Sequence, residues 1–236
     1  MALKKSTGRE VWAMLLDDST ILIGDGSTVK TVKDHLYCIV AFASSSSVLP
    51  SGLKKGDCFF SLSALTLGSG DKVIELGDIF STDNLIGYAR SKDISKTKST
   101  VDMTVDGDLS DAGDVRVDPT VSISGNINGY LVNGLPATSA SRKIDAKFGK
   151  QIIQASDNTF TTVDKNDDIS LIALIYIKSL RDNSVDVDIV PCHFTSNGAS
   201  TDYGSATSKS VAFTGCAESA GGVLPQTITV TFPVSA

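Results

Sequence analysis

Residues 227–232 read TITVTF, the clearest strand signal in the chain. Threonines alternate there with Ile228, Val230 and Phe232, and a proline stands just outside the run on each side. A period of two places alternate side chains on opposite faces of a strand, and β-branched residues favour strands. The stretch therefore predicts a β-strand with one apolar face.

A second alternating stretch, residues 121–131, reads VSISGNINGYL. Apolar residues and glycines occupy its odd positions, while serine, asparagine and tyrosine occupy its even positions. Gly125 and Gly129 interrupt the apolar face, where glycine commonly marks a bulge or a bend. We expect this strand to belong to a curved sheet.

Short strand signals recur along the whole chain, separated by Gly, Asp, Asn and Ser. Residues 171–177 (LIALIYI) are apolar on both faces, which favours a strand between two layers but leaves a buried helix possible. Further strands are predicted at residues 11–16, 21–24, 36–43, 58–64, 72–76, 99–105, 185–190 and 210–214.

One helix is predicted, over residues 141–155, because apolar residues recur there at spacings of four. Lys143, Lys147 and Lys150 form a basic stripe beside the apolar one. The predicted fold is mainly β, with two packed antiparallel sheets, as a sandwich or half-barrel, and one flanking α-helix. All-β domains reach this length alone, so residues 1–236 are expected to form a single domain, although two small domains are possible.

Two stretches are predicted to be long loops or insertions, residues 44–56 and 91–118. The first is rich in serine and has an apolar centre at Leu49, whereas the second ends in an acidic segment with Asp106, Asp108, Asp111 and Asp114.

Composition limits the classes of function. The 236 residues carry a net charge of −6, which argues against a protein that grips nucleic acid by its phosphates. No apolar run is long enough for a membrane helix, and the N-terminal residues lack the apolar segment of a signal peptide, so we expect no membrane insertion. The four scattered cysteines and the absence of a glycosylation sequon fit reduced thiols and synthesis in a cytoplasm.

No catalytic or metal-binding motif stands out. His35 and His193 have no recognisable nucleophile or acid beside them. The acidic segment resembles a calcium loop in spacing, but Asp111 stands where a glycine is needed and Val117 where a glutamate is needed. We therefore expect no enzyme activity, no metal and no cofactor.

Separate basic and acidic segments suggest contacts between copies of the chain. A basic helix carrying Lys143, Lys147 and Lys150 could meet the acidic segment of a neighbouring copy in a head-to-tail contact. Leu49 is a further candidate interface residue. Charges alone fit solvated faces equally well.

In its order of elements, the chain resembles the major tail-tube protein family of long-tailed bacteriophages. The resemblance lies in TVSISGNINGYL, the helix ASRKIDAKFGKQIIQ, the strand ISLIALIYIKS, and the closing strands SKSVAFTG and QTITVTFPV, about half of the chain. It implies subunits whose sheets join into a barrel in a hexameric ring, and rings stacked into a tube in the virion tail. DNA would pass through this channel without specific binding.

The resemblance also implies partners, namely other copies of the chain and tail proteins such as tape measure, terminator and baseplate proteins. The N-terminal half of the chain departs from the family pattern, so the resemblance leaves the role of that half open. The alternative function is a β-sandwich adhesion or carbohydrate-binding module, which needs the same strands but no polymerisation.

Overall fold

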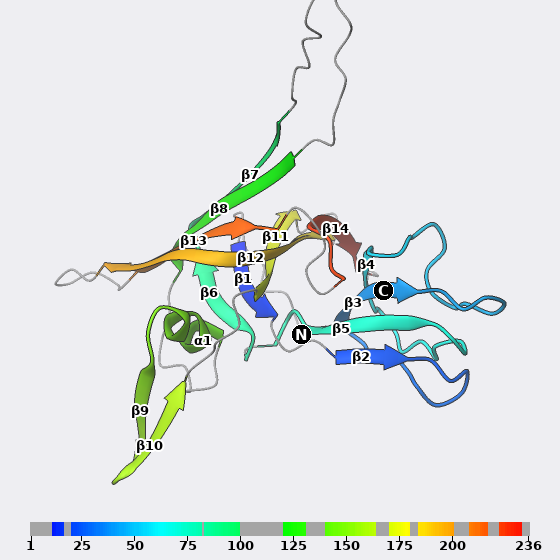
Figure 1. Cartoon of the computed structure of the whole chain (residues 1–236), viewed down its shortest axis with the longest axis horizontal. Coiled ribbons are helices and arrows are strands. Elements are labelled where there is room, and N and C mark those ends of the chain that lie inside the picture. The colour runs from blue at the N-terminus through cyan, green and yellow to red at the C-terminus, as the bar shows by residue number, and fades with distance from the viewer. Residues whose placement is uncertain are drawn as a thin grey trace, which may run out of the picture.

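The structure is a computed structural model that describes residues 11–16, 20–81, 83–99, 120–130, 140–163, 170–179, 184–200, 208–216 and 222–232. It is mostly β, with one short helix, and three sheets account for its strands (Figure 1). The predicted fold class is confirmed. The larger two sheets are antiparallel and pack face to face, and α1 lies against the larger of them.

The large sheet has the strand order β6-β1-β11-β12-β13-β8-β7, and β14 also pairs with β12. These strands are β1 (Val11–Leu16), β6 (Leu85–Ala89), β7 (Ser91–Ser99), β8 (Thr120–Tyr130), β11 (Ser170–Ser179), β12 (Ser184–Ser200), β13 (Ser208–Gly215) and β14 (Gln226–Thr231). The sheet curls into a half-barrel, which brings the end of β6 to β8. Arg90, directly after β6, donates its backbone N–H to the carbonyl of Asn128 in β8 at 2.9 Å.

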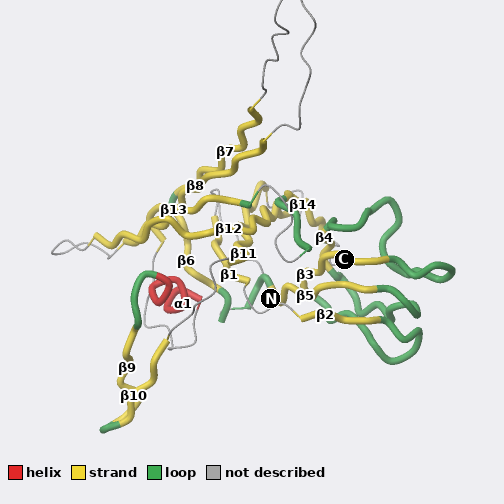
Figure 2. Tube along the Cα trace, in the orientation of Figure 1, coloured by secondary structure: helices red, strands yellow, loops and turns green. Residues whose placement is uncertain are grey.

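The small sheet has the order β2-β5-β3-β4, and a separate two-stranded hairpin consists of β9 and β10. The small sheet contains β2 (Thr20–Ile23), β3 (His35–Ala41), β4 (Cys58–Phe60) and β5 (Lys72–Asp78). The hairpin contains β9 (Gln151–Ser156) and β10 (Thr159–Val163), and it follows α1 (Ala140–Lys147). Figure 2 shows this hairpin extending from the helix, away from both larger sheets.

Three apolar clusters hold these layers together. The barrel core lies on the concave side of the large sheet, where Ile144 of α1 packs with Ile123, Ile127, Val211 and Phe213. The inter-sheet core joins the large sheet to the small one, and the outer core fills the far side of the small sheet beneath its own loops. Strands β3 and β5 are therefore buried on both faces, whereas the edge strand β2 leaves Ile21 and Ile23 exposed.

The two glycines of β8 act differently. At Gly129, with φ +69°, the register with β13 shifts by one residue, which is the bulge that the sequence predicts. Gly125 pairs in register with Phe213, and a Cβ there would lie 2.5 Å from the ring. Gly125 thus leaves room for an aromatic side chain across the sheet.

The predicted helix is half wrong. Helix α1 ends at Lys147, and residues 151–155 belong to strand β9. The turn at Phe148 and Gly149, whose N–H groups bond to Asp145 and Ala146, ends the helix. Gly149 weakens a helix and Ile152–Ile153 favour a strand, so local propensity overrode the spacing of four.

The predicted loop over residues 91–118 is also corrected in part. Residues 91–99 form the edge strand β7, paired along its length with β8, while residues 100–118 lie outside the described residues. Residues 44–56 contain no helix or strand. Strands β6, β7, β9 and β10 were not predicted, and the predicted strand over 99–105 falls outside the described residues except for Ser99.

None of the described helices is long and apolar enough to cross a membrane.

Candidate assembly surfaces

A wide polar face covers the convex side of the large sheet where the small sheet does not reach. It is built by alternate residues of β7, β8, β13 and the second half of β12, which the registers place side by side. We call it the polar face. Its residues are Ser91, Asp93, Ser95, Thr97, Ser124, Asn126, Asn128, His193, Ser196, Gly198, Ser210, Ala212 and Thr214.

The polar face carries almost no charge. Asp93 and His193 are its ionisable side chains, and the others are small and uncharged or are amides. Lys92 of β7 points to the concave side instead, where it forms an ion pair with Asp188 of β12. Strict alternation along the strands therefore separates the lysine from this solvent-facing surface.

The even positions of residues 121–131, which read Ser, Ser, Asn, Asn and Tyr, contained the signal for this face. The sequence alone could not assign it, because the neighbouring strands come from β7, β12 and β13, far apart along the chain.

Strand β7 ends the large sheet on one side. Within the described part of the chain, it pairs with β8 and leaves its other edge open. Figure 1 shows β7 and β8 extending together beyond the body of the molecule. An open strand edge is a template for pairing with another chain.

The β9–β10 hairpin exposes apolar side chains. Ile152 is 66 % exposed and Phe160 is 59 % exposed. Register pairs Phe160 with Gln154 and Ile152 with Thr162, so Ile152 and Phe160 lie diagonally on one face of the hairpin. We call this the hairpin face.

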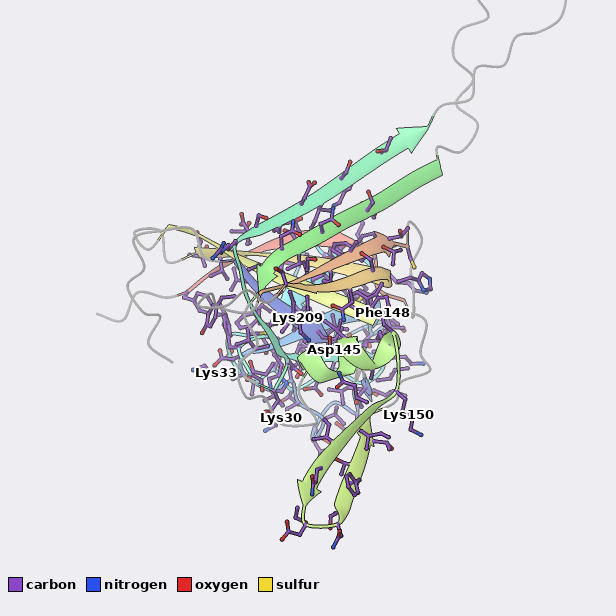
Figure 3. The ribbon with its side chains drawn as sticks, turned by 90° about the vertical axis from the view of Figure 1, so that its left-hand side faces the viewer. Lys30, Lys33, Asp145, Phe148, Lys150 and Lys209 are labelled. Atoms are coloured by element: carbon purple, nitrogen blue, oxygen red, sulfur yellow. The ribbon has the colours of Figure 1, made fainter. Side chains whose placement is uncertain are left out.

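Helix α1 is fixed to the sheet by polar contacts. Asp145 forms an ion pair with Lys209 of β13 and accepts a hydrogen bond from the amide of Asn197 in β12 at 2.8 Å. Figure 3 shows Lys209 and Asp145 close together, with Phe148 and Lys150 at the start of the hairpin. The sequence did not predict this contact, because its three residues come from α1, β12 and β13, which are far apart along the chain.

The predicted basic stripe is only partly described. Lys147 places its Nζ 5.9 Å from the centre of the Phe194 ring, and Lys150 is exposed after the end of the helix. The side chain of Lys143 and all four aspartates, Asp106, Asp108, Asp111 and Asp114, lie outside the described residues. The contact between the stripe and the acidic segment stays a prediction.

Leu49, the remaining candidate interface residue, is buried in its own subunit. It is 7 % exposed and packs in the outer core with Tyr37, Phe59 and Leu67. Its burial explains the apolar centre of the serine-rich loop without a neighbouring copy.

An apolar groove of about 360 Å³ lies between β4 and β14. Its lining residues are Leu53, Cys58, Phe59, Phe60, Leu62, Ile228, Thr229, Val230 and Thr231. Gln226 fixes one end, since its side chain accepts the N–H of Cys58 at 2.7 Å and donates to the carbonyl of Gly56 at 2.9 Å.

Three titratable groups form a small cluster on the small sheet. His35 Nδ1 lies 2.5 Å from Glu75 Oε1, and the Tyr37 hydroxyl donates to the same oxygen at 3.2 Å. Burial of the phenol, with Glu75 beside it, raises the pKa of Tyr37 to about 12. Sequence reasoning missed this arrangement, which joins β3 to β5.

The cysteines are free thiols, and Cys38, Cys58 and Cys192 are buried. Cys38 and Cys58 face each other across β3 and β4. Their mutual hydrogen bond and burial raise the pKa of Cys58, which keeps that thiol protonated. Among the described residues, no three His, Cys, Asp or Glu side chains gather as metal ligands would.

No family model matches the chain, and no curated protein matches it in sequence. A solved structure described as the tail of an empty GTA particle, refined with helical C6 symmetry, is similar over 56 % of this chain and 81 % of its own. The two share 17 % sequence identity and superpose with a TM-score of 0.34.

Proposed function

We propose that this chain is a structural subunit of a bacteriophage tail tube, which self-assembles into stacked hexameric rings around a channel for DNA delivery. The observation that carries the proposal is the polar face, a broad and nearly uncharged surface on a curled sheet. Tubes that conduct a polymer need such a surface on their inner side.

DNA is a dense polyanion, and proteins hold it chiefly by placing Lys and Arg against its phosphates. The polar face offers serine, threonine and asparagine, which bond to water, and it turns Lys92 to the opposite side. A channel lined in this way would let DNA pass without retaining it, since neither strong attraction nor strong repulsion acts on the phosphates.

Ring formation would remove the open edges of the large sheet. Strand β7 ends that sheet, and pairing it with an edge of the next copy would extend the sheet around the ring. A head-to-tail contact of this kind closes into a ring when its rotation divides a full turn. The long β7–β8 arm would reach toward neighbouring copies.

This role assigns the protein to the virion tail, made in the host cytoplasm, with tape measure, terminator and baseplate proteins as further partners. It needs no catalysis and no cofactor. The adhesion or carbohydrate-binding alternative is less well supported. Among the described residues, the exposed aromatics Phe42, Tyr88, Phe148 and Phe160 lie on different elements rather than on one platform.

The first test is electron microscopy of the purified protein in negative stain, with light scattering over a range of concentrations. We expect rings or hollow tubes of uniform width that grow with concentration. Monomers at every concentration would overturn the proposal and favour the binding module.

The second test locates the channel lining by cysteine labelling in a Cys216→Ser background. Asn126→Cys on the polar face is compared with Ser69→Cys, an exposed position on a loop of the small sheet. In assembled tubes, a maleimide attached to a carrier protein too wide for the channel should label Ser69→Cys but not Asn126→Cys. Equal labelling of both in tubes would show that the polar face lies on the outside.

A further inference from the structure

The structure points to a second contact between copies, which rests on the proposed self-assembly. We propose that the hairpin face of one copy docks into the groove between β4 and β14 of the next. The hairpin supplies a protruding apolar surface, and the groove supplies a matching apolar depression on a distant part of the chain.

Among the described residues, no apolar side chain covers the hairpin face. Ile152 and Phe160 are both more than half exposed, although each lies in a paired part of the hairpin. Burying two such side chains in an apolar site stabilises a contact by about 25 cal/mol for each Å² removed from water. Neighbouring exposed apolar side chains on a projecting element are candidates for a docking site.

The groove suits apolar side chains. Its lining includes the buried Val230, the partly buried Phe60 and Leu62, which is 44 % exposed. The Gln226 contacts hold β4 and β14 at a fixed separation, so the groove exists before a partner arrives. A preformed site avoids the cost of ordering its own walls on binding.

A second copy fits the groove better than the same chain does. The hairpin and the two strands of the groove lie on opposite sides of the molecule in Figure 1, so one chain cannot join them without rearrangement. The hairpin turn carries Asp157, and exposed Lys54 and Lys55 follow the groove residue Leu53. Opposite charges would orient the incoming hairpin tip.

Two different patches that fit each other make a heterologous contact, which propagates from copy to copy. The contact would therefore add to pairing at the edge of β7 and would tie successive copies through side chains rather than through strands.

The test is site-specific photocrosslinking, with benzoylphenylalanine placed at Phe160 in the full chain. Irradiation should yield covalent dimers, and mass spectrometry should map the attachment to residues 53–62 or 228–231. The matched control places the same group at Thr161, on the opposite face of β10. It should give far fewer crosslinks to those peptides.

A double substitution, Ile152→Ser with Phe160→Ser, gives the energetic test. The concentration needed for assembly should rise about tenfold or more, with the unfolding midpoint of the monomer unchanged. Tubes that form normally, or crosslinks that map elsewhere, would overturn this contact while leaving the tube function intact. A wild-type chain that never assembles would overturn both.

Discussion

The small sheet and the large sheet differ in how much of their surface the rest of the chain covers. The central strands of the small sheet, β3 and β5, bury one face in the inter-sheet core and the other beneath the loops of that sheet. The large sheet leaves the polar face uncovered, ends in the open edge of β7 and extends the β7–β8 arm. The centre of the small sheet is thus complete within one chain, whereas the large sheet presents a broad uncovered face and an open strand edge that a second copy could use.

The largest expected difference in stability is between variants of two phenylalanines, Phe213 and Phe160. Phe213 is buried in the barrel core, so Phe213→Ala should lower the free energy of unfolding by about 3–5 kcal/mol. Phe160→Ala on the exposed hairpin should change it by about 0.5 kcal/mol or less. Urea denaturation of both variants measures the difference. Similar losses would mean that the hairpin packs on the body in solution.

The next effect tests whether the loops of the small sheet are part of its structure. The buried carboxylate of Asp71 accepts N–H groups of Ala43, Val48 and Gly68 at 2.7, 3.2 and 3.0 Å. Asp71→Ala would leave these donors without that partner and should cost about 3 kcal/mol in urea denaturation. A loss below about 0.5 kcal/mol would show that the loops do not depend on this carboxylate.

The same residue makes stability depend on pH. Burial opposes ionisation of Asp71, but the hydrogen bonds from the loops outweigh it, so its pKa lies below the ordinary value. Its contribution is complete above about pH 4, the value for an unfolded aspartate, and disappears as pH falls through the lower folded pKa. Thermal unfolding of Asp71→Asn should therefore change less with pH below about 4 than that of the wild type.

The smallest expected difference in stability is between alanine variants of two serines, Ser61 and Ser124. Ser61 on the small sheet is buried, lies 2.9 Å from the Thr31 hydroxyl and donates to the carbonyl of Ser63, so Ser61→Ala should cost about 1–2 kcal/mol. Ser124 on the polar face is exposed, and Ser124→Ala should cost less than about 0.5 kcal/mol. Equal losses of stability in thermal denaturation would contradict the view that the polar face does not stabilise the monomer.

Much of the strand pattern was predictable, because alternation and β-branched runs report local burial. Strands β1, β8, β11 and β14 were predicted close to their observed bounds. The end of α1 was not, since a spacing of four continued past Gly149 although the chain turned there. Strand β7 was not predicted, because its lysines indicated a solvated loop. In the structure, Lys92 forms an ion pair with Asp188 on the concave side of the sheet.

The candidate assembly surfaces and the contacts of α1 with the large sheet were less predictable than the strands. The polar face, the groove and the contacts of Asp145 each combine residues from distant segments, and no single stretch of sequence records that meeting. Leu49 illustrates the converse, because an apolar residue in a polar loop proved to serve the interior of its own subunit.

Strand β12 has a mechanical consequence. It runs for 17 residues and pairs with β11 and β14 along its first part and with β13 along its second. Tension along β12 loads these ladders in shear, so many bonds must break together. A force that pulls β9 and β10 apart, perpendicular to the strands, breaks the hydrogen bonds of the hairpin one pair at a time. A stretched subunit would thus yield first at the hairpin, while β12 carries the load.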